Sequence, residues 1–116
     1  MTPSPPNAAD AAELQRHLDA ALAALPEVEH VNGYPINPPA VLAFSSYLSR
    51  SPWHRADYIA DMKSDLRGDL ETLALPQIRS YLTFLIRVDR FNPGGLLHEL
   101  EAGHATRAVA RARELT

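Results

Sequence analysis

The stretch Arg87 to Leu96, RVDRFNPGGL, followed by the tetrad LEAG at residues 100–103, decides the fold. It separates two segments whose apolar residues recur every three or four positions, which is the period of one helix face. A proline and two glycines between these segments are typical of a turn, because proline continues a helix poorly and glycine relaxes the backbone. The sequence therefore predicts two helices joined by a tight turn.

Upstream of this turn, the periodicity predicts a helix from Pro76 to Arg90. Proline suits the first turn of a helix, since its missing N–H would have no partner there. Downstream, a short helix from Gly95 to Ala102 and a last helix from His104 to Leu115 are expected. Gly103 lies between them and suits the left-handed position that often follows a helix end. The C-terminal third is thus expected to be helix, turn, short helix, turn, helix.

Two helices are predicted in the first half of the chain. Asn7 is a suitable cap for the first, and Pro26 ends it. Asn37 is a suitable cap for the second, which runs to Arg50. The Asn-Gly dipeptide at 32–33 is typical of a hairpin turn, but its flanks are too short to predict strands.

A third helix is predicted after Ser51, because that residue and the proline behind it repeat the pattern of a cap followed by a first-turn proline. This helix would carry Trp53, which is expected in the core, and Ile59. We therefore expect an all-α fold, a compact bundle of five or six helices formed by residues 7–116 as one domain. Residues 1–6 contain three prolines and are predicted to be a disordered leader.

Composition excludes several classes of protein. The 116 residues are 46% hydrophobic and 22% charged, as in ordinary globular proteins. Without cysteine there is neither a disulfide framework nor a thiolate metal site. No apolar run approaches the length needed to cross a membrane, so no membrane partner and a cytoplasmic location are expected.

The run from Arg87 to Gly103, RVDRFNPGGLLHELEAG, resembles the signature of a bacterial family, the domain of unknown function 6508. That signature is Arg-x-acid-Arg-Phe-x-x-Gly-x-Leu, followed by Leu-Glu-x-Gly. The matching positions are Arg87, Asp89, Arg90, Phe91, Gly94, Leu96, Leu100, Glu101 and Gly103. Family members often carry a Cys-acid pair where this chain has Asn and Pro at 92–93. The resemblance implies a shared fold and no particular activity.

We interpret this run as an architectural joint between helices. The joint consists of Arg87, Arg90, Phe91, Gly94, Glu101 and Gly103. One of its two arginines is expected to form an ion pair with Glu101 or with Asp89 and so to pin the turn. A phosphate-binding loop is not favoured, because no strand precedes the glycines and no lysine follows them.

Four aspartates recur at every fourth position: Asp57, Asp61, Asp65 and Asp69. On an unbroken helix they would form an acidic stripe, which could hold Mg²⁺ with substrate phosphates or meet a basic surface of a partner. Lys63 and Arg67 lie within four residues of several of these acids and favour a plain solvated face. The aspartates and Tyr58 are the candidate partner-binding residues, and the sequence leaves open whether they bind anything.

Arg107 and Arg111 share one face of the last helix, and such groups could contact phosphate in a helix-turn-helix protein. However, no cluster of Asn, Gln or Ser is present there to read base edges, and the net charge of −3 does not recommend nucleic acid. For the arginines as a set, the structural ion pair of Arg87 or Arg90 is favoured over a phosphate site, and the sequence leaves open whether Arg107 and Arg111 contact phosphate.

The segment His98 to His104, HELEAGH, superficially resembles the helix of a zinc protease. That chemistry needs two histidines one turn apart, whereas six residues on a continuous helix leave the side chains about 120° apart. No metal site, catalytic residue or cofactor is predicted.

The favoured function is a non-catalytic bacterial or phage interaction module, an accessory or inhibitory protein that binds a protein partner through its acidic face. Two alternatives remain: a small DNA-binding regulator that uses the arginines of the last helix, and an enzyme with a dispersed His/Glu site. The sequence identifies neither the partner nor the oligomeric state.

Overall fold

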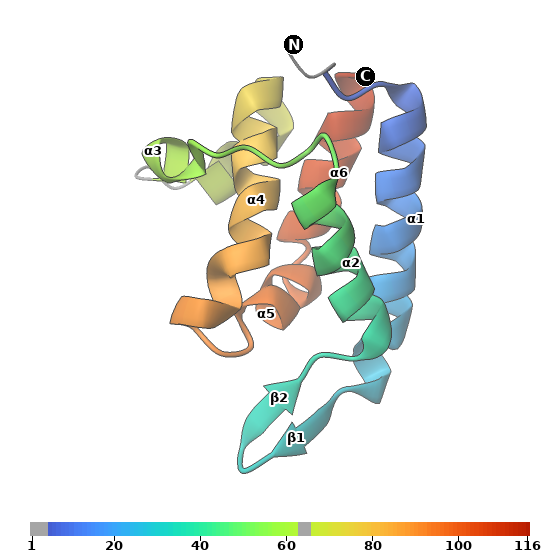
Figure 1. Ribbon diagram of the computed structural model, residues 1–116, viewed down its shortest axis with the longest axis vertical. Coiled ribbons are helices and arrows are strands. Elements are labelled where there is room, and N and C mark those ends of the chain that lie inside the picture. Colours follow the sequence, from blue (N-terminus) through green and yellow to red (C-terminus); the bar gives the residue numbers. More distant parts are fainter. Residues whose placement is uncertain (1–4, 63–65) are drawn as a thin grey trace.

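The computed structural model describes residues 5–62 and 66–116, and within them the chain is mostly helical (Figure 1). Its α-helices are α1 (Ala8–Ala24), α2 (Pro39–Arg50), α3 (Tyr58–Met62), α4 (Leu75–Phe91), α5 (Gly95–Glu101) and α6 (His104–Glu114). Short 3-10 helices occupy η1 (Leu25–Glu27) and η2 (Leu66–Thr72), and the strands are β1 (Glu29–Val31) and β2 (Tyr34–Ile36). The prediction of a helical bundle is confirmed.

The long helices α1, α2, α4 and α6 enclose the core, while α3 lies outside α4 and α5 closes the lower end (Figure 1). The largest fully buried side chains are Trp53, Tyr81, Phe44, Leu14, Leu18, Leu48, Leu70, Ile78, Leu82, Leu85, Leu96 and Leu100. Three of the alanines of α6, Ala105, Ala108 and Ala112, are fully buried as well, and their small side chains let this helix approach α1 and α4 closely. The expected core position of Trp53 is confirmed.

The C-terminal unit has the predicted order of helix, turn, short helix, turn and helix. Gly94 and Gly103 precede α5 and α6 with φ angles of +83° and +84°. This left-handed region favours glycine because a Cβ atom would collide with the backbone. Each of the two turns therefore has a glycine at the residue whose backbone is left-handed.

Two expectations about helix starts are wrong. Asn37 does not cap α2, because its side-chain amide donates instead to Asp89 Oδ2 at 2.8 Å, and Pro38 occupies the cap position. The segment after Ser51 does not open a helix, and α3 begins only at Tyr58. The buried Trp53 anchors this segment through its Nε1–H, which donates to the Tyr47 hydroxyl at 3.0 Å. Long-range contacts thus override the local helix signal.

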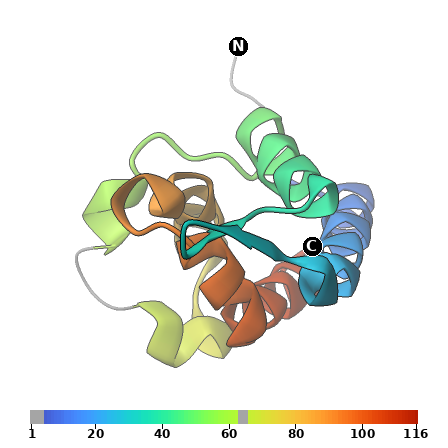
Figure 2. The same ribbon diagram turned by 90° about the horizontal axis from the view of Figure 1, so that it is seen from below.

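The Asn-Gly dipeptide does close a hairpin, although its strands are only three residues long. The strands pair antiparallel, with Glu29 opposite Ile36 and Val31 opposite Tyr34. The turn residues have φ angles of +53° and +83°, as the tight turns that join two strands require. Seen from below, the hairpin lies across the end of the bundle (Figure 2). A two-stranded ribbon is marginal by itself, so contact with the bundle supports it.

Most of the predicted leader, residues 1–4, lies outside the described residues. Pro6, which was expected to have nothing to pack against, is buried. Within residues 5–62 and 66–116, no helix combines the length and the apolar character needed to cross a bilayer.

Candidate functional site

The aspartate series does not form a stripe on one helix. Asp57 precedes α3, which begins at Tyr58, and Asp69 lies at a kink of η2, where its φ and ψ are −127° and 28°. Asp65 lies outside the described residues. Asp61 is an ion-pair partner of Arg55 and accepts the Ser80 hydroxyl at 2.5 Å, so it holds α3 against α4. The unbroken helix that an acidic stripe would require is therefore not present at Asp57 and Asp69.

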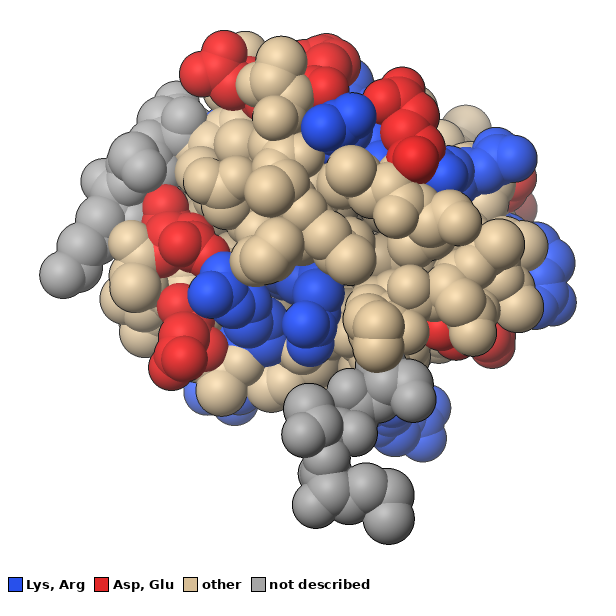
Figure 3. Space-filling view, turned by 90° about the horizontal axis from the view of Figure 1, so that it is seen from above, with Lys and Arg blue, Asp and Glu red and all other residues tan. Residues whose placement is uncertain are grey.

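Charge on the upper end of the molecule is mixed. In the space-filling view from above, acidic and basic side chains lie next to one another around an uncharged centre (Figure 3). Intramolecular ion pairs, such as Arg107 with Glu71 and Arg111 with Glu114, also engage charges of both signs within the chain. On the face that Figure 3 shows, the described residues therefore offer no large surface of one sign to a basic partner.

The joint after α4 is held by a carboxylate that accepts hydrogen bonds. Asp89 Oδ1 accepts the main-chain N–H of Leu96 at 3.0 Å, while its Oδ2 accepts the amide of Asn37. Within the described chain, no ion pair joins Arg87 or Arg90 to Asp89 or Glu101. The expected ion pair is thus wrong, because the carboxylate is already occupied by uncharged donors.

The arginines of α6 are bound to the preceding segment of the same chain. Arg107 forms a two-pronged ion pair with Glu71, in which Nη2 and Oε2 are 2.6 Å apart, and it also donates to the main-chain oxygen of Arg67. The side-chain hydrogen bonds from Arg107 lower the pKa of Glu71 to about 2. Arg111 Nε donates to the main-chain oxygen of Leu73 at 2.9 Å. The ion pairs of the arginine set are thus formed by Arg107 and Arg111, and not by Arg87 or Arg90 as expected.

A buried carboxylate, Glu99, links α4, α5 and α6. Its Oε1 accepts the Tyr81 hydroxyl at 3.1 Å, its Oε2 lies 3.0 Å from His104 Nδ1, and Arg67 is 3.7 Å away. Burial, together with Glu99, raises the pKa of Tyr81 above its ordinary range, which keeps the hydroxyl a neutral donor. This network satisfies a charge that would otherwise be costly to bury.

His98 and His104 are closer than a continuous helix would place them. Their rings meet edge to face with centroids 6.4 Å apart, because the turn at Gly103 redirects the chain between them. Even so, no group of three or more possible ligands comes together to hold a metal among the described residues.

An apolar groove of about 330 Å³ lies between α3 and α4. Its lining residues are Tyr58, Ile59, Met62, Phe84, Arg87 and Phe91. Ile59 and Phe91 expose 63% and 81% of their surfaces. Arg87 contributes a guanidinium whose Nε is buried and has no hydrogen-bond partner in the described residues. We call this feature the α3–α4 groove.

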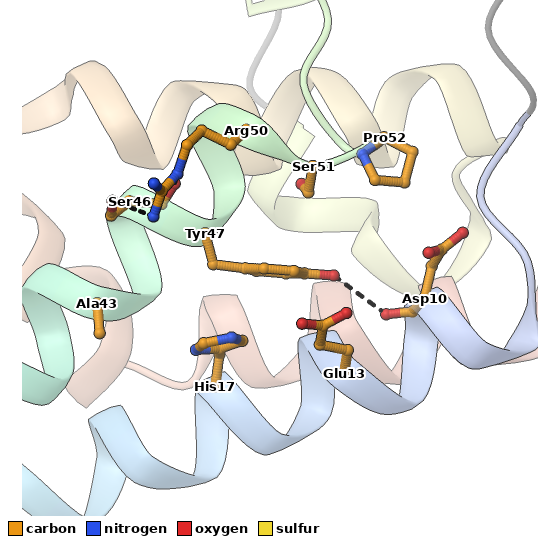
Figure 4. Close-up of a pocket in the computed structure, with 9 residues that line it drawn as sticks. All are labelled: Asp10, Glu13, His17, Ala43, Ser46, Tyr47, Arg50, Ser51 and Pro52. Carbon is orange, nitrogen blue, oxygen red and sulfur yellow. Dashed lines mark hydrogen bonds between the residues drawn. The ribbon is translucent and has the colours of Figure 1, made fainter.

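A second, polar cleft of about 630 Å³ lies between α1 and α2 (Figure 4). Its lining residues are Asp10, Glu13, His17, Ala43, Ser46, Tyr47, Arg50, Ser51 and Pro52. The Tyr47 ring reaches from α2 towards α1 and stacks on His17, with centroids 4.4 Å apart. We call this feature the α1–α2 cleft.

Residues 26–116 match the Family of unknown function, DUF6508. The chain belongs to this family. The DUF6508 match confirms the resemblance that the C-terminal run suggested, and it includes the hairpin and every helix from α2 to α6. No curated protein and no solved structure matches the chain.

The two surface features differ in their relation to the DUF6508 region. The α3–α4 groove is built only from residues inside the match, whereas the α1 wall of the α1–α2 cleft lies outside it. Sequence reasoning found Tyr58 but missed both features as sites. Apolar periodicity shows which residues share a helix face, but it does not show which face another helix leaves uncovered.

Proposed function

We propose that the protein is a non-catalytic interaction module and that its binding surface is the α3–α4 groove. The observation that carries the proposal is the exposure of Ile59 and Phe91 at the edges of an apolar depression. Large apolar side chains that gather on a surface are typical of partner-binding sites, and aromatic residues are enriched among those that contribute most to binding. The acidic-face version of this function has less support, because the aspartates are not aligned.

The chemistry of the groove favours an apolar segment that carries a carboxylate. Arg87 lines the groove, and Arg90 lies one helical turn along the same helix. Neither arginine makes an ion pair with an acid in the described residues. A partner that brings its own acidic group would pair with the guanidinium of Arg87 at the groove while its apolar side chains cover Ile59 and Phe91.

The other two functions have weaker support. Arg107 and Arg111 already bind acidic and main-chain oxygens of this chain, which leaves fewer donors for phosphate. His104 is oriented by Glu99 as a catalytic histidine can be, yet neither residue lines the α3–α4 groove or the α1–α2 cleft.

Selection of peptides from a random displayed library against the immobilised protein tests the proposal. Enriched peptides are expected to combine at least two large apolar residues with one Asp or Glu. The double variant Ile59→Ser and Phe91→Ser should bind these peptides more than tenfold more weakly. Burial of each apolar side chain at the interface contributes about 1.5–3 kcal/mol to the free energy of binding. Leu42→Ser is the matched control, since Leu42 is 54% exposed on α2 outside the groove.

The proposal fails if the enriched peptides bind the double variant as tightly as the wild type. Arg87→Met tests the electrostatic part separately. The wild type should bind an enriched peptide that carries Glu more tightly than the same peptide with Gln at that position. In the Arg87→Met variant this difference should disappear, while the apolar residues of the peptide still contribute to its binding. Circular dichroism of each variant shows that the helical fold is retained.

A further inference from the structure

We propose that the segment bound by the α3–α4 groove is the β1–β2 hairpin of a second copy of this chain, an inference that rests on the proposed function because the groove is the receiving surface. The hairpin presents large apolar side chains next to carboxylates, which is the chemistry that the groove favours in a partner. Both surfaces lie within the residues that match DUF6508.

The hairpin has its large apolar residues on the face that points away from the bundle. His30 and Pro35 are cross-strand partners, and both line a small hollow against α5. Because side chains alternate along a strand, the opposite face, which we call the hairpin face, is formed by Glu29, Val31, Tyr34 and Ile36. Its three apolar residues expose between 47% and 62% of their surfaces. An antiparallel sheet that packs by one face normally carries polar residues on the other, so the hairpin face is one that a partner would cover.

The unpaired charges beside the two surfaces are opposite in sign. Glu27 and Glu29 line one hollow beside Ile36, and both are exposed and make no ion pair in the described residues. Residues 17–49 contain no lysine or arginine. At the groove, Arg87 and Arg90 are the unpaired charges. Contact between the surfaces would therefore bring carboxylates to guanidinium groups while the apolar side chains of both are covered.

The hairpin is held away from the groove of its own chain. Pro35 lies so close to Gly94 that an added Cβ atom would be 2.9 Å from the proline ring, which places the inner face of the hairpin against the α4–α5 turn. Figure 1 shows the hairpin beyond the lower ends of α2 and α4, whereas α3, one wall of the groove, lies higher along α4. No residue of the hairpin face lines the groove. The hairpin is already folded, so its binding to a second copy loses little conformational entropy.

Sedimentation equilibrium of the full-length protein, from micromolar to millimolar concentration, tests the inference. The average mass of the wild type should rise with concentration. Tyr34→Ser should weaken association at least tenfold, because an aromatic residue at the centre of an interface contributes strongly to binding. The double variant Ile59→Ser and Phe91→Ser should weaken it as much. Leu42→Ser is the matched control, since Leu42 is exposed on α2 and belongs to neither surface.

A mixture of these variants distinguishes the contact from any symmetric one. The two surfaces differ, so the contact is head-to-tail and either closes into a ring or extends as a chain. Each variant alone should stay monomeric. An equimolar mixture should form a one-to-one complex, because the Tyr34→Ser variant keeps its groove and the double variant keeps its hairpin face. Formation of this complex also shows that both variants are folded.

Glu29→Gln tests the contribution of charge. It should weaken association about threefold at low salt and less at high salt, because salt screens exposed charges. Asp19→Asn removes one exposed negative charge from α1 outside both surfaces and should leave association unchanged. Equal effects of the two substitutions would show that only net charge matters, which contradicts a contact at Glu29.

Failure of this inference can be told apart from failure of the proposed function. A wild type that stays monomeric at millimolar concentration, while selected peptides still bind the groove, overturns the inference alone. Association that survives in the double variant of Ile59 and Phe91, or in Tyr34→Ser, overturns it as well, because one of the two surfaces is then not used. If neither peptides nor a second copy bind the groove, both proposals are wrong.

Discussion

Asp89 caps α5 by accepting the main-chain N–H of Leu96 on Oδ1 at 3.0 Å. Its other oxygen accepts the side-chain amide of Asn37, so one carboxylate fixes both the α4–α5 turn and the segment that follows the hairpin. We expect Asp89→Ala to lower the free energy of unfolding by about 2 kcal/mol, with the helix cap and the second hydrogen bond contributing about equally. Urea denaturation measures this loss.

The control for Asp89 is Glu101→Gln. Glu101 is exposed and makes no ion pair in the described residues, so its neutralisation should change the free energy of unfolding by less than about 0.5 kcal/mol. A cost comparable to that of Asp89→Ala would show that an ion pair to Glu101 holds the joint after all.

Gly94 is required for two reasons that a pair of variants can separate. Its φ is +83°, and a Cβ atom there would lie 2.9 Å from Cγ of Pro35 in the hairpin. Gly33 has the same φ but open space around it. Gly33→Ala should therefore lower the free energy of unfolding by about 1 kcal/mol, through backbone strain alone. Gly94→Ala should lower it by about 3 kcal/mol, because the new Cβ atom also overlaps with Pro35. Equal losses of thermal stability would mean that the hairpin contact contributes nothing.

The C-terminal helices could be predicted because their signals are local. Proline at the start of α4, the two glycines before α5 and Gly103 before α6 each favour one backbone conformation within a few residues. The same reasoning failed at Asn37, whose sequence context is that of a helix cap. There a partner 52 positions away in the sequence, Asp89, binds the side chain instead.

The surface sites could not be predicted, because they depend on which faces remain uncovered. Ile59 was expected on a helix that begins after Ser51, but α3 begins only at Tyr58 and leaves Ile59 63% exposed. The sequence indicated no partner for Arg107, because its carboxylate partner Glu71 lies 36 positions earlier. Periodicity contains no information about such pairings, since they arise only when the elements pack.

Glu99 is expected to contribute to stability through its buried hydrogen bonds. Glu99→Gln should lower the free energy of unfolding by about 2 kcal/mol. The carboxylate uses one oxygen for Tyr81 and the other for His104, whereas an amide has an acceptor oxygen on one side only and a donor nitrogen on the other. Tyr81→Phe should cost about 1 kcal/mol, since it removes only one of the donors. Urea denaturation again measures both, with Glu101→Gln on the same helix as the matched control. If the two Gln variants lose equal stability, the buried network has no special role.

The ion pair between Arg107 and Glu71 makes stability depend on pH in a defined direction. Hydrogen bonds from Arg107 hold the pKa of Glu71 at about 2 in the folded chain, below its ordinary value of 4.5. A carboxylate with a lowered pKa stabilises the fold fully above the ordinary value, and this contribution disappears as the pH falls through the folded value. Because both side chains are well exposed, salt should screen the effect.

Glu71→Gln should therefore be less stable than the wild type at neutral pH, and the difference should shrink from about pH 4.5 downwards and vanish near pH 2. Urea midpoints measured at a series of pH values and at low salt follow this difference. Arg107→Gln should show the same pH dependence, because it removes the other half of the pair. A difference that stays constant down to pH 2, or one that high salt leaves unchanged, would mean that Glu71 acts by packing and not by its charge.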